Sequence, residues 1–222
     1  MSNALWDIVD HYFNEHLLIE DDALQHALTS SHAANLPSFN VAANQGKLLQ
    51  LLAQIQGATR ILEIGTLGGY STIWLARALP AHGQLITLEL EPHHARIAQD
   101  NIAYAGLTEQ VSILVGNARQ SLQQLVNEQQ TAFDFIFIDA DKPSSTIYFK
   151  FALQLSRIGT VIVFDNVVRE GKVVNHDSQD DRVLGVRQLV DELAQEKRIQ
   201  ATALQTVGTK GYDGIIIARV IA

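Results

Sequence analysis

The fold of this chain is decided by one stretch, Arg60-Ile-Leu-Glu-Ile-Gly-Thr-Leu-Gly-Gly-Tyr-Ser71, which Thr72-Ile-Trp-Leu-Ala-Arg-Ala-Leu79 follows directly. The stretch opens with a short apolar run that ends at Gly65, and from Ser71 onward the apolar residues recur at helical spacing. This pattern predicts a strand, a tight turn and a helix. Glycine lets the backbone approach a ligand closely, and the unpaired N–H groups of the helix start face the same place. We therefore expect a cradle for a small molecule, although the residues also fit an ordinary glycine-rich turn of an α/β domain.

The spacing of the glycines restricts which class of ligand the turn can bind. A dinucleotide-binding turn requires Gly-x-Gly-x-x-Gly, and here Leu67 occupies the position of the second glycine, which disfavours NAD. Glu63 stands two residues before Gly65, and a second acid, Glu89, closes the next apolar run. This arrangement resembles the S-adenosylmethionine (SAM) site of class I methyltransferases.

Composition limits the class of protein. The 222 residues, 47% of them apolar and 18% charged, suit one globular domain over residues 1–222. The net charge of −8 and the absence of a basic run argue against a nucleic-acid partner. The chain has no cysteine, so a thiolate metal site is impossible. Because the apolar runs are short and the amino terminus carries Asp7 and Asp10, we expect a soluble, cytoplasmic protein with no membrane partner.

The first part of the chain is helical in pattern. Residues 1–56 are expected to form a helical cap, interrupted near Pro37, and residues 57–222 the core. Two apolar faces support the helices, and their residues are Leu5, Ile8 and Tyr12 on one and Leu48, Leu51, Leu52 and Ile55 on the other.

Beyond this cap, apolar runs alternate with amphipathic helices. The runs are Arg60–Gly65, Gln84–Leu90, Val111–Val115, Phe133–Asp139, Thr160–Asp165, Ile199–Gln205 and Gly214–Val220. Helices are predicted between them, for example at Pro92–Ala105 and near Asp180–Glu196, where Val183, Val186, Val190 and Leu193 align. Alternation of this kind predicts a parallel sheet covered on both faces. Since the link between the last two runs permits only a hairpin, we expect an α/β, Rossmann-like fold with seven strands, mostly parallel, and an antiparallel last strand.

An acid at the end of the second run fits the ribose of a nucleoside. Glu89 and Glu91 both stand there, and a carboxylate at the carboxyl end of a strand can accept hydrogen bonds from two ribose hydroxyls. We prefer Glu89, because Pro92 opens the following helix and leaves Glu91 at its cap. The neighbouring His93 and His94 point in different directions on a helix and are interpreted as surface residues.

Three oxygen-bearing side chains follow two other runs. Asp139 ends the fourth run, and Asp165 and Asn166 end the fifth. If these strands pair, the three side chains converge, since neighbouring strands lie about 4.8 Å apart. An all-oxygen set suits a hard divalent cation, with Mg²⁺ the first choice and Ca²⁺ or Mn²⁺ as alternatives. Acids and asparagine are also common simply where strands end, so the metal site is a hypothesis.

Taken together, the motifs resemble the cation-dependent O-methyltransferases of the caffeoyl-CoA and catechol type, and more narrowly their small bacterial members. The residues that carry the resemblance are Leu62-Glu-Ile-Gly-Thr, Gly69-Tyr-Ser71, Phe137-Ile-Asp-Ala-Asp-Lys142 and Asp165-Asn-Val167, with Asn44-Gln-Gly-Lys-Leu-Leu49 and Gly211-Tyr-Asp-Gly214. The resemblance implies a cation held by Asp139, Asp165 and Asn166, with Asp139 and Lys142 in catalysis and Lys142 as base. It implies SAM contacts at Val41, Glu63, Gly65, Thr66, Tyr70, Ser71, Glu89, Gly116, Ala118, Asp139 and Asp141.

The expected reaction moves a methyl group from SAM to a hydroxyl of a small phenolic acceptor with two vicinal hydroxyls, in an enzyme expected to be a homodimer. A CoA thioester acceptor is doubtful, because no basic cluster near the amino terminus suits a CoA phosphate. Two alternatives stay open: a Mg²⁺-dependent hydrolase of the haloacid-dehalogenase type that uses Asp139 and Asp141, and a protein that holds SAM without transfer. Two segments outside the core sheet are predicted to cap the acceptor site: the amino-terminal helices before Pro37 and the long, charged loop from Val167 to Asp181. For the loop, a mobile surface excursion without contacts is the alternative.

Overall fold

One seven-stranded sheet organises the structure, a computed structural model that describes residues 3–19 and 21–222. Its strand order is β3-β2-β1-β4-β5-β7-β6, with β7 antiparallel to both of its neighbours. The predicted sheet, including the hairpin at its end, is therefore confirmed. The predicted cap over residues 1–56 also includes Met1, Ser2 and Glu20, which lie outside the described residues.

The strands agree closely with the predicted runs. They are β1 (Arg60–Ile64), β2 (Gln84–Glu89), β3 (Val111–Val115), β4 (Phe133–Ile138), β5 (Ser156–Phe164), β6 (Ile199–Gly208) and β7 (Gly211–Val220). Hairpin strands β6 and β7 are longer than predicted, because polar residues of β6 that break the apolar pattern still pair along its whole length. Asp139 and Asp165 each lie one residue beyond their strand.

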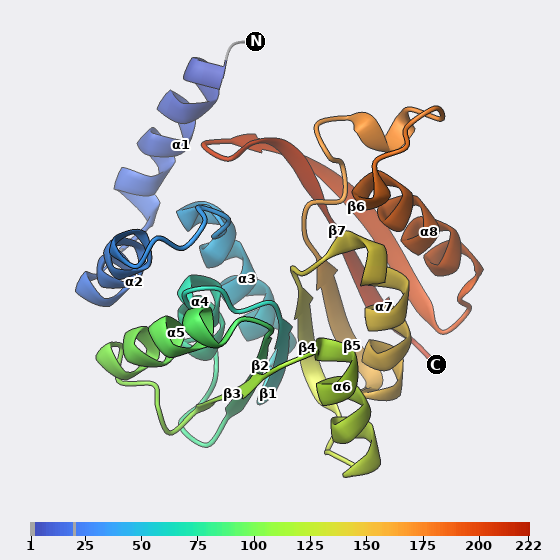
Figure 1. Cartoon of the computed structure of the whole chain (residues 1–222), viewed down its shortest axis with the longest axis horizontal. Coiled ribbons are helices and arrows are strands. Elements are labelled where there is room, and N and C mark those ends of the chain that lie inside the picture. Colours follow the sequence, from blue (N-terminus) through green and yellow to red (C-terminus); the bar gives the residue numbers. More distant parts are fainter. Residues whose placement is uncertain (1–2, 20) are drawn as a thin grey trace.

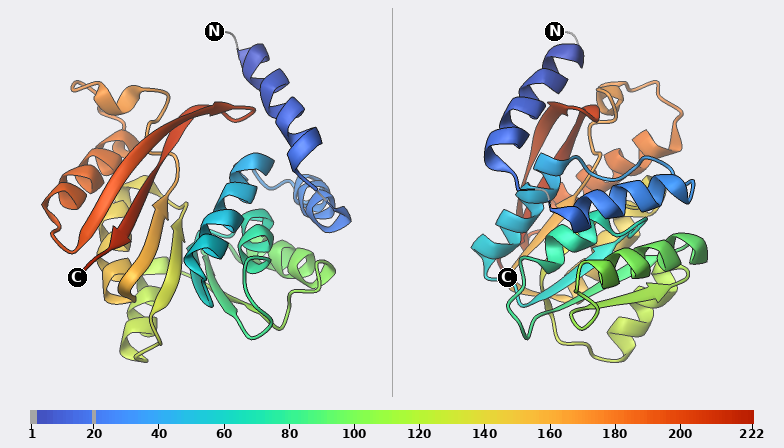
Figure 2. Two further views of the ribbon diagram at one scale, coloured as in Figure 1. Left: turned by 180° about the vertical axis from the view of Figure 1, so that it is seen from behind. Right: turned by 90° about the vertical axis from the view of Figure 1, so that its left-hand side faces the viewer.

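Helices cover both faces of the sheet, as Figures 1 and 2 show. They are α1 (Asn3–Leu17), α2 (Asp22–Ala33), α3 (Ala43–Gln56), α4 (Tyr70–Ala76), α5 (Pro92–Tyr104), α6 (Ala118–Asn127), α7 (Ser145–Gln154) and α8 (Asp181–Gln195), with 3₁₀ turns η1 (Lys142–Ser144) and η2 (Lys172–Val174). Helices α2 to α5 pack on one face and α6 to α8 on the other. Within the described ranges, no helix is both long and apolar enough to cross a lipid bilayer.

The hydrophobic core forms two layers, one on each side of the sheet. Along β4, Ile136 packs toward α6 to α8, whereas Phe135 and Phe137 pack toward α3 to α5. This alternation follows from the pleat, which sends successive side chains to opposite faces. The parallel strands β1, β2, β4 and β5 are thus fixed on both sides, and their carboxyl ends meet at one edge of the sheet.

The apolar faces noted on the first and third helices are largely exposed. Leu5, Ile8 and Tyr12 on α1 are exposed, and so are Leu48, Leu51 and Ile55 on α3, whereas Leu52 packs against the core. The buried face of α3 holds Gly46, Leu49, Gln50 and Ala53, and Gly46 lies against the Trp74 ring. On α8, Val183, Val186 and Leu193 are buried, but Val190, which aligns with them, is exposed. Helix α1 projects from the body beside the tip of the β6–β7 hairpin (Figure 1), so its apolar side chains remain uncovered within this chain.

Candidate functional site

A large cavity lies at the carboxyl edge of the sheet. Its volume is about 1250 Å³, and its wall includes the ends of β1, β2, β4 and β5. Among the predicted site residues, the wall contains Val41, Gly65, Thr66, Tyr70, Ser71, Glu89, Ala118, Asp139, Asp141, Lys142, Asp165 and Asn166. Glu63 and Gly116 are not part of the wall. The structure therefore brings the two predicted halves of the site into one cavity: the glycine turn, and the oxygen-bearing trio of Asp139, Asp165 and Asn166.

The turn after β1 is built around the Glu89 carboxylate. One of its oxygens, Oε2, accepts hydrogen bonds from the backbone N–H groups of Thr66 at 3.2 Å and Leu67 at 2.7 Å. Gly65 has a φ of 101°, and a Cβ at this position would lie 2.1 Å from the carbonyl oxygen of Asp139. Only glycine fits there without strain. The turn is thus fixed by a buried acid, and the missing side chain at Gly65 lets it pack against the backbone at the end of β4.

Glu63 lies behind the cavity rather than in its wall. Its side chain is fully buried and accepts hydrogen bonds from the hydroxyls of Ser71, Thr72 and Thr87. Burial raises the pKa of Glu63 to about 7, although the three hydroxyl donors oppose this rise. The carboxyl group therefore fixes the start of α4, and with it Ser71, which does line the cavity. In this geometry Glu63 positions its neighbours, and a ligand in the cavity does not reach it directly.

The choice between Glu89 and Glu91 agrees with the local structure. Pro92 is the first residue of α5 and Glu91 is its N-cap. The Glu89 side chain is buried, and its Oε1 accepts a hydrogen bond from the Glu91 N–H at 2.9 Å. His94 was interpreted as a surface residue, and this was wrong: it lines the cavity, with Nδ1 3.5 Å from Glu89 Oε1. The helix start turns His94 back over the end of β2, whereas His93 stays exposed.

The oxygen-bearing trio, Asp139, Asp165 and Asn166, lies just beyond the paired strands β4 and β5. Ile138 is opposite Phe164 in the parallel register, so Asp139 and Asp165 leave the sheet side by side. Asp165 is buried, and its Oδ1 accepts the N–H of Asn166, which has a φ of 53°. Burial and the nearby Asp139 carboxylate raise the pKa of Asp165 to about 7. Two carboxylates that lie close together and are shielded from water repel each other, and a bound divalent cation would neutralise their charge.

Gln45 lies beside Asp165, and no role was predicted for it from the sequence. Its Nε2 donates to Asp165 Oδ2 at 2.7 Å, and the residue lines the cavity. The only sequence signal was its place in Asn44-Gln-Gly-Lys-Leu-Leu49. Among the described residues, no cluster of three histidine, cysteine or acidic side chains suits a metal. The predicted set has a different composition, two carboxylates and one amide, so it is an oxygen-only set that fits a hard cation.

Lys142 is buried beside the trio. Its Nζ lies 3.2 Å from Asp139 Oδ1, and its backbone is pressed against α8, where a Cβ on Gly185 would lie 2.2 Å from the Lys142 carbonyl oxygen. The ammonium of Lys142 thus has a fixed position at the cavity wall.

A second acid of the motif, Asp141, is bound to the following helix. It accepts hydrogen bonds from the Tyr148 hydroxyl and the Ser144 N–H. Burial, and then Asp141, raise the pKa of Tyr148 far above its usual range, so Tyr148 stays a neutral donor.

Other parts of the cavity wall come from segments far from the glycine turn. Helices α1 and α2 contribute Trp6 and Leu28, the segment before α3 contributes Phe39, and the loop after β5 contributes Arg169 and Glu170. The final hairpin adds Lys210 from its turn and Gly211, Tyr212 and Asp213 from the start of β7. The amino-terminal helices and the loop after β5 were predicted to cap the acceptor site, whereas Gly211-Tyr-Asp-Gly214 was noted without a role and no local pattern marked Phe39 or Lys210.

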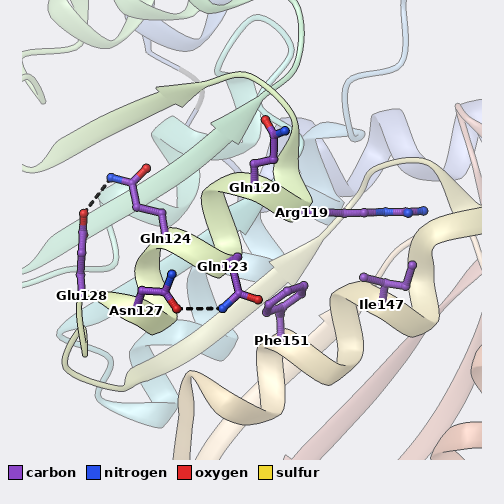
Figure 3. Close-up of a pocket in the computed structure, with 8 residues that line it drawn as sticks. All are labelled: Arg119, Gln120, Gln123, Gln124, Asn127, Glu128, Ile147 and Phe151. Carbon is purple, nitrogen blue, oxygen red and sulfur yellow. Dashed lines mark hydrogen bonds between the residues drawn. The ribbon is translucent and has the colours of Figure 1, made fainter.

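A second hollow lies on the outer face of α6 and α7, with a volume of about 630 Å³ (Figure 3). Half of its lining side chains are amides, and two of them donate to a neighbour: Gln123 to Asn127 at 2.9 Å and Gln124 to Glu128 at 2.7 Å. None of the predicted site residues lines this hollow, and Arg119 lines both it and the large cavity. The chemistry of the chain is therefore concentrated in the large cavity.

Comparison with known proteins identifies the reaction class. The family model described as O-methyltransferase matches residues 14–221. A catechol O-methyltransferase of Niastella koreensis is 54% identical, over 98% of this chain and 99% of its own length, and one of Mycobacterium tuberculosis is 44% identical, over 96% and 94%. The crystal structure of the O-methyltransferase from Bacillus cereus in complex with SAH has a TM-score of 0.97 at 54% identity, and it covers 99% of this chain and 100% of that one. These matches confirm the predicted class I fold and the predicted SAM-dependent O-methyltransferase, and the chain belongs to the O-methyltransferase family.

Proposed function

We propose that this O-methyltransferase moves the methyl group of SAM to one hydroxyl of a small aromatic acceptor that carries two vicinal hydroxyls, with a divalent cation held beside the methyl donor. The observation that carries the proposal is the single cavity in which the Glu89 turn and the Asp139, Asp165 and Asn166 side chains share one wall. Relatives named catechol O-methyltransferase, similar over nearly their whole length, support the same acceptor class.

The glycine turn is the proposed SAM site. Its residues fit a nucleoside with an amino-acid tail: the backbone at Gly65 is open to the cavity, and the Glu89 carboxylate is fixed at the end of β2. The cavity volume of about 1250 Å³ exceeds the roughly 300–1000 Å³ typical of a pocket for one small ligand, so it has room for donor and acceptor together. The SAM complex of the related enzyme TomG from Streptomyces achromogenes, with a TM-score of 0.97 at 47% identity over all of both chains, supports this assignment.

The cation is proposed to bind to Asp139, Asp165 and Asn166, with Mg²⁺ as the natural choice for oxygen ligands and Ca²⁺ or Mn²⁺ as substitutes. A bound divalent cation supplies a Lewis acid that lowers the pKa of a coordinated hydroxyl. The protein contributes the fixed geometry: Gln45 holds one oxygen of Asp165, and the backbone N–H of Asn166 holds the other. Two vicinal hydroxyls suit this site because both can turn toward the same wall.

Lys142 is the proposed proton acceptor. As the acceptor oxygen bonds to the methyl carbon, the carbon–sulfur bond breaks and its electron pair stays on sulfur. The products are a methyl ether, S-adenosylhomocysteine and a proton from the hydroxyl. The buried Nζ, close to Asp139, is placed at the same wall as the trio and can take that proton when its amine is neutral. Its burial also keeps water away from the reacting oxygen.

We further propose that residues 57–222 act as the catalytic core and residues 1–56 as its cap, and that two chains form a homodimer. Trp6 and Leu28 of the cap line the cavity, which supports a part in acceptor binding. The uncovered apolar side chains on α1 include Leu5, Ile8 and Tyr12, and such a patch supports an interface. Size-exclusion chromatography with light scattering tests the dimer: a monomeric mass at micromolar concentration would contradict it.

The test of the function is methyl transfer from labelled SAM to catechol, resorcinol and hydroquinone, which differ only in the spacing of their hydroxyls. The proposal predicts turnover of the vicinal diol alone, its loss after EDTA treatment and its return with excess Mg²⁺. Equal turnover of the three isomers would contradict the role of vicinal hydroxyls. Full activity after exhaustive chelation would contradict the role of the cation.

A further inference from the structure

Two cationic side chains line the acceptor end of the cavity without a full set of anionic partners. Arg169 belongs to the loop that follows the proposed cation ligand Asn166, and Lys210 to the turn between β6 and β7. The neighbouring cations are already neutralised: Arg182 bonds to Asp180 through two nitrogens, and Lys172 pairs with Glu170 at 2.8 Å. Of the two remaining cations, Arg169 has only a 3.6 Å contact with Asp213, and Lys210 bonds to neutral groups alone.

Arg169 is fixed in place by its backbone. Its N–H donates to Asp213 Oδ1 at 2.9 Å, as does that of Val168 at 2.8 Å, and its φ of 55° is one that side chains other than glycine rarely adopt. The guanidinium itself makes one loose contact, from Nη1 to Asp213 Oδ2 at 3.6 Å, and its buried Nε has no hydrogen-bond partner. Strain of this kind is maintained where it serves a site. A half-buried guanidinium whose Nε is buried without a partner and whose other donors are poorly used favours an anion beside it.

Lys210 faces only neutral groups. Its Nζ donates to the Ser38 carbonyl oxygen at 3.1 Å and contacts Asn40 Oδ1 at 3.5 Å, and in the described part of the chain no carboxylate lies within ion-pair distance of it. The residue as a whole is exposed, yet loss of water around the ammonium lowers the pKa of Lys210. A third N–H of the ammonium is left for a ligand.

Chain connections and a hydrogen bond link the two cations and the proposed cation site, and all of them line the same cavity. Asp213, which binds the Arg169 backbone, is three residues from Lys210, so their Cα atoms are at most about 10 Å apart. Arg169 is likewise three residues from Asn166, with the same limit of about 10 Å. The Tyr212 ring supports the loop from behind, since a Cβ on Gly171 would lie 3.4 Å from its Cε1. An acceptor whose diol binds at Asp139, Asp165 and Asn166 therefore shares one cavity with both cations, which are the partners available to an anionic substituent.

The geometry points to an anion subsite, formed by Arg169 and Lys210, that binds the carboxylate of an ortho-diphenol bearing an acid group. This inference rests on the proposed function and adds the class of acceptor. A planar guanidinium matches the two oxygens of a carboxylate, and the ammonium adds a point charge. The chain carries a net charge of −8, so attraction for an acidic acceptor has to come from such a local site.

The experiment compares three acceptors, 3,4-dihydroxybenzoate, its methyl ester and catechol, at saturating SAM and Mg²⁺. The wild-type kcat/KM should be higher for the acid than for the ester, and Lys210→Met and Arg169→Met should each lower this ratio by about tenfold or more. Lys150→Met is the matched control, because Lys150 pairs with Glu192 outside the cavity and should leave the ratio unchanged. Circular dichroism and SAM binding establish that each variant is folded.

A charge reversal gives the inference a second test. Lys210→Glu should turn the preference from 3,4-dihydroxybenzoate toward an ortho-diphenol with an ammonium side chain. An acid-to-ester ratio near one in the wild type, or a ratio that neither Met variant changes, overturns the subsite. A caffeoyl-CoA thioester used better than the free acid, with the loss in the same variants, overturns the carboxylate in favour of a phosphate. If wild-type enzyme methylates none of these diphenols, including catechol, it is the proposed function that fails.

Discussion

Glu63→Gln should change how the stability of this protein depends on pH. The Glu63 carboxyl is fully buried among three hydroxyl donors, and burial raises its pKa from 4.5 to about 7. Because the folded-state pKa lies above the unfolded value, the folded protein binds more protons between these two values. The stability that the neutral carboxyl contributes is complete below pH 4.5 and is lost as the pH rises through 7.

The magnitude follows from the two pKa values. A difference of about 2.5 pH units corresponds to about 3 kcal/mol at about 1.4 kcal/mol per unit, and most of it falls between pH 5 and pH 8. Glutamine has the same shape and carries no charge at any pH. The free energy of unfolding of Glu63→Gln, relative to wild type, should therefore rise by about 2 to 3 kcal/mol from pH 5 to pH 8. Other titrating groups are common to both proteins and cancel in this difference.

The assay is urea unfolding followed by circular dichroism at pH 5, 6, 7 and 8. Asp134→Asn is the control. Burial raises the pKa of Asp134, but the N–H groups of Thr59 and Arg60, the Thr59 hydroxyl and Arg157 outweigh it and hold the pKa below its usual value. Its stabilising effect is lost only as the pH falls below about 4, so this variant should be destabilised by a constant amount across the range. A Glu63→Gln variant that follows wild type at every pH would refute the buried, protonated carboxyl.

Three further predictions concern the site. Gly65→Ala should weaken SAM binding and lower the Tm, because its Cβ would lie 2.1 Å from the Asp139 carbonyl oxygen; Gly57→Ala, also at positive φ but with no atom within 4 Å, should leave SAM binding unchanged. Gln45→Ala should weaken Mn²⁺ binding about tenfold by freeing Asp165, whereas Gln50→Ala should not, as titration calorimetry can measure. Replacing Val168 to Asp177 by a short Gly-Ser linker should spare SAM binding and lower acceptor turnover; unchanged acceptor kinetics would mean that this loop is not a lid.

The central sheet could be predicted from the sequence because each of its strands has a local signature. Four apolar runs of strand length end at Gly65, Glu89, Asp139 and Asp165. Because these strands are parallel, the residues at their ends lie at the same edge of the sheet. The place of Glu63 could not be predicted, since an acid in a strand faces either a ligand or a helix, and here three hydroxyls on α4 and β2 bind it. Which of the two occurs depends on the face of the sheet to which the side chain points and on what packs against that face.

The cap was harder to predict for a different reason. Helical periodicity located α1 and α3, but the apolar face that it picks out on α3 is not the buried one: Leu48 and Ile55 are exposed, whereas Gly46 and Gln50 are buried. Arg169 and Lys210 come together only because Asp213 binds the loop after β5 to the final hairpin. Contacts between segments so far apart in the chain leave no local pattern.

The most direct test of the account is binding of Mn²⁺ to the wild-type protein and to Asp165→Asn, measured by electron paramagnetic resonance with SAM binding followed in parallel by calorimetry. Asparagine keeps the size of the side chain and removes one of the two carboxylate charges beside Asn166. The account predicts one Mn²⁺ site per wild-type chain, its loss or strong weakening in Asp165→Asn, and SAM binding retained in both. Equal Mn²⁺ affinity in the two proteins would contradict the assignment of Asp139, Asp165 and Asn166 as the cation site.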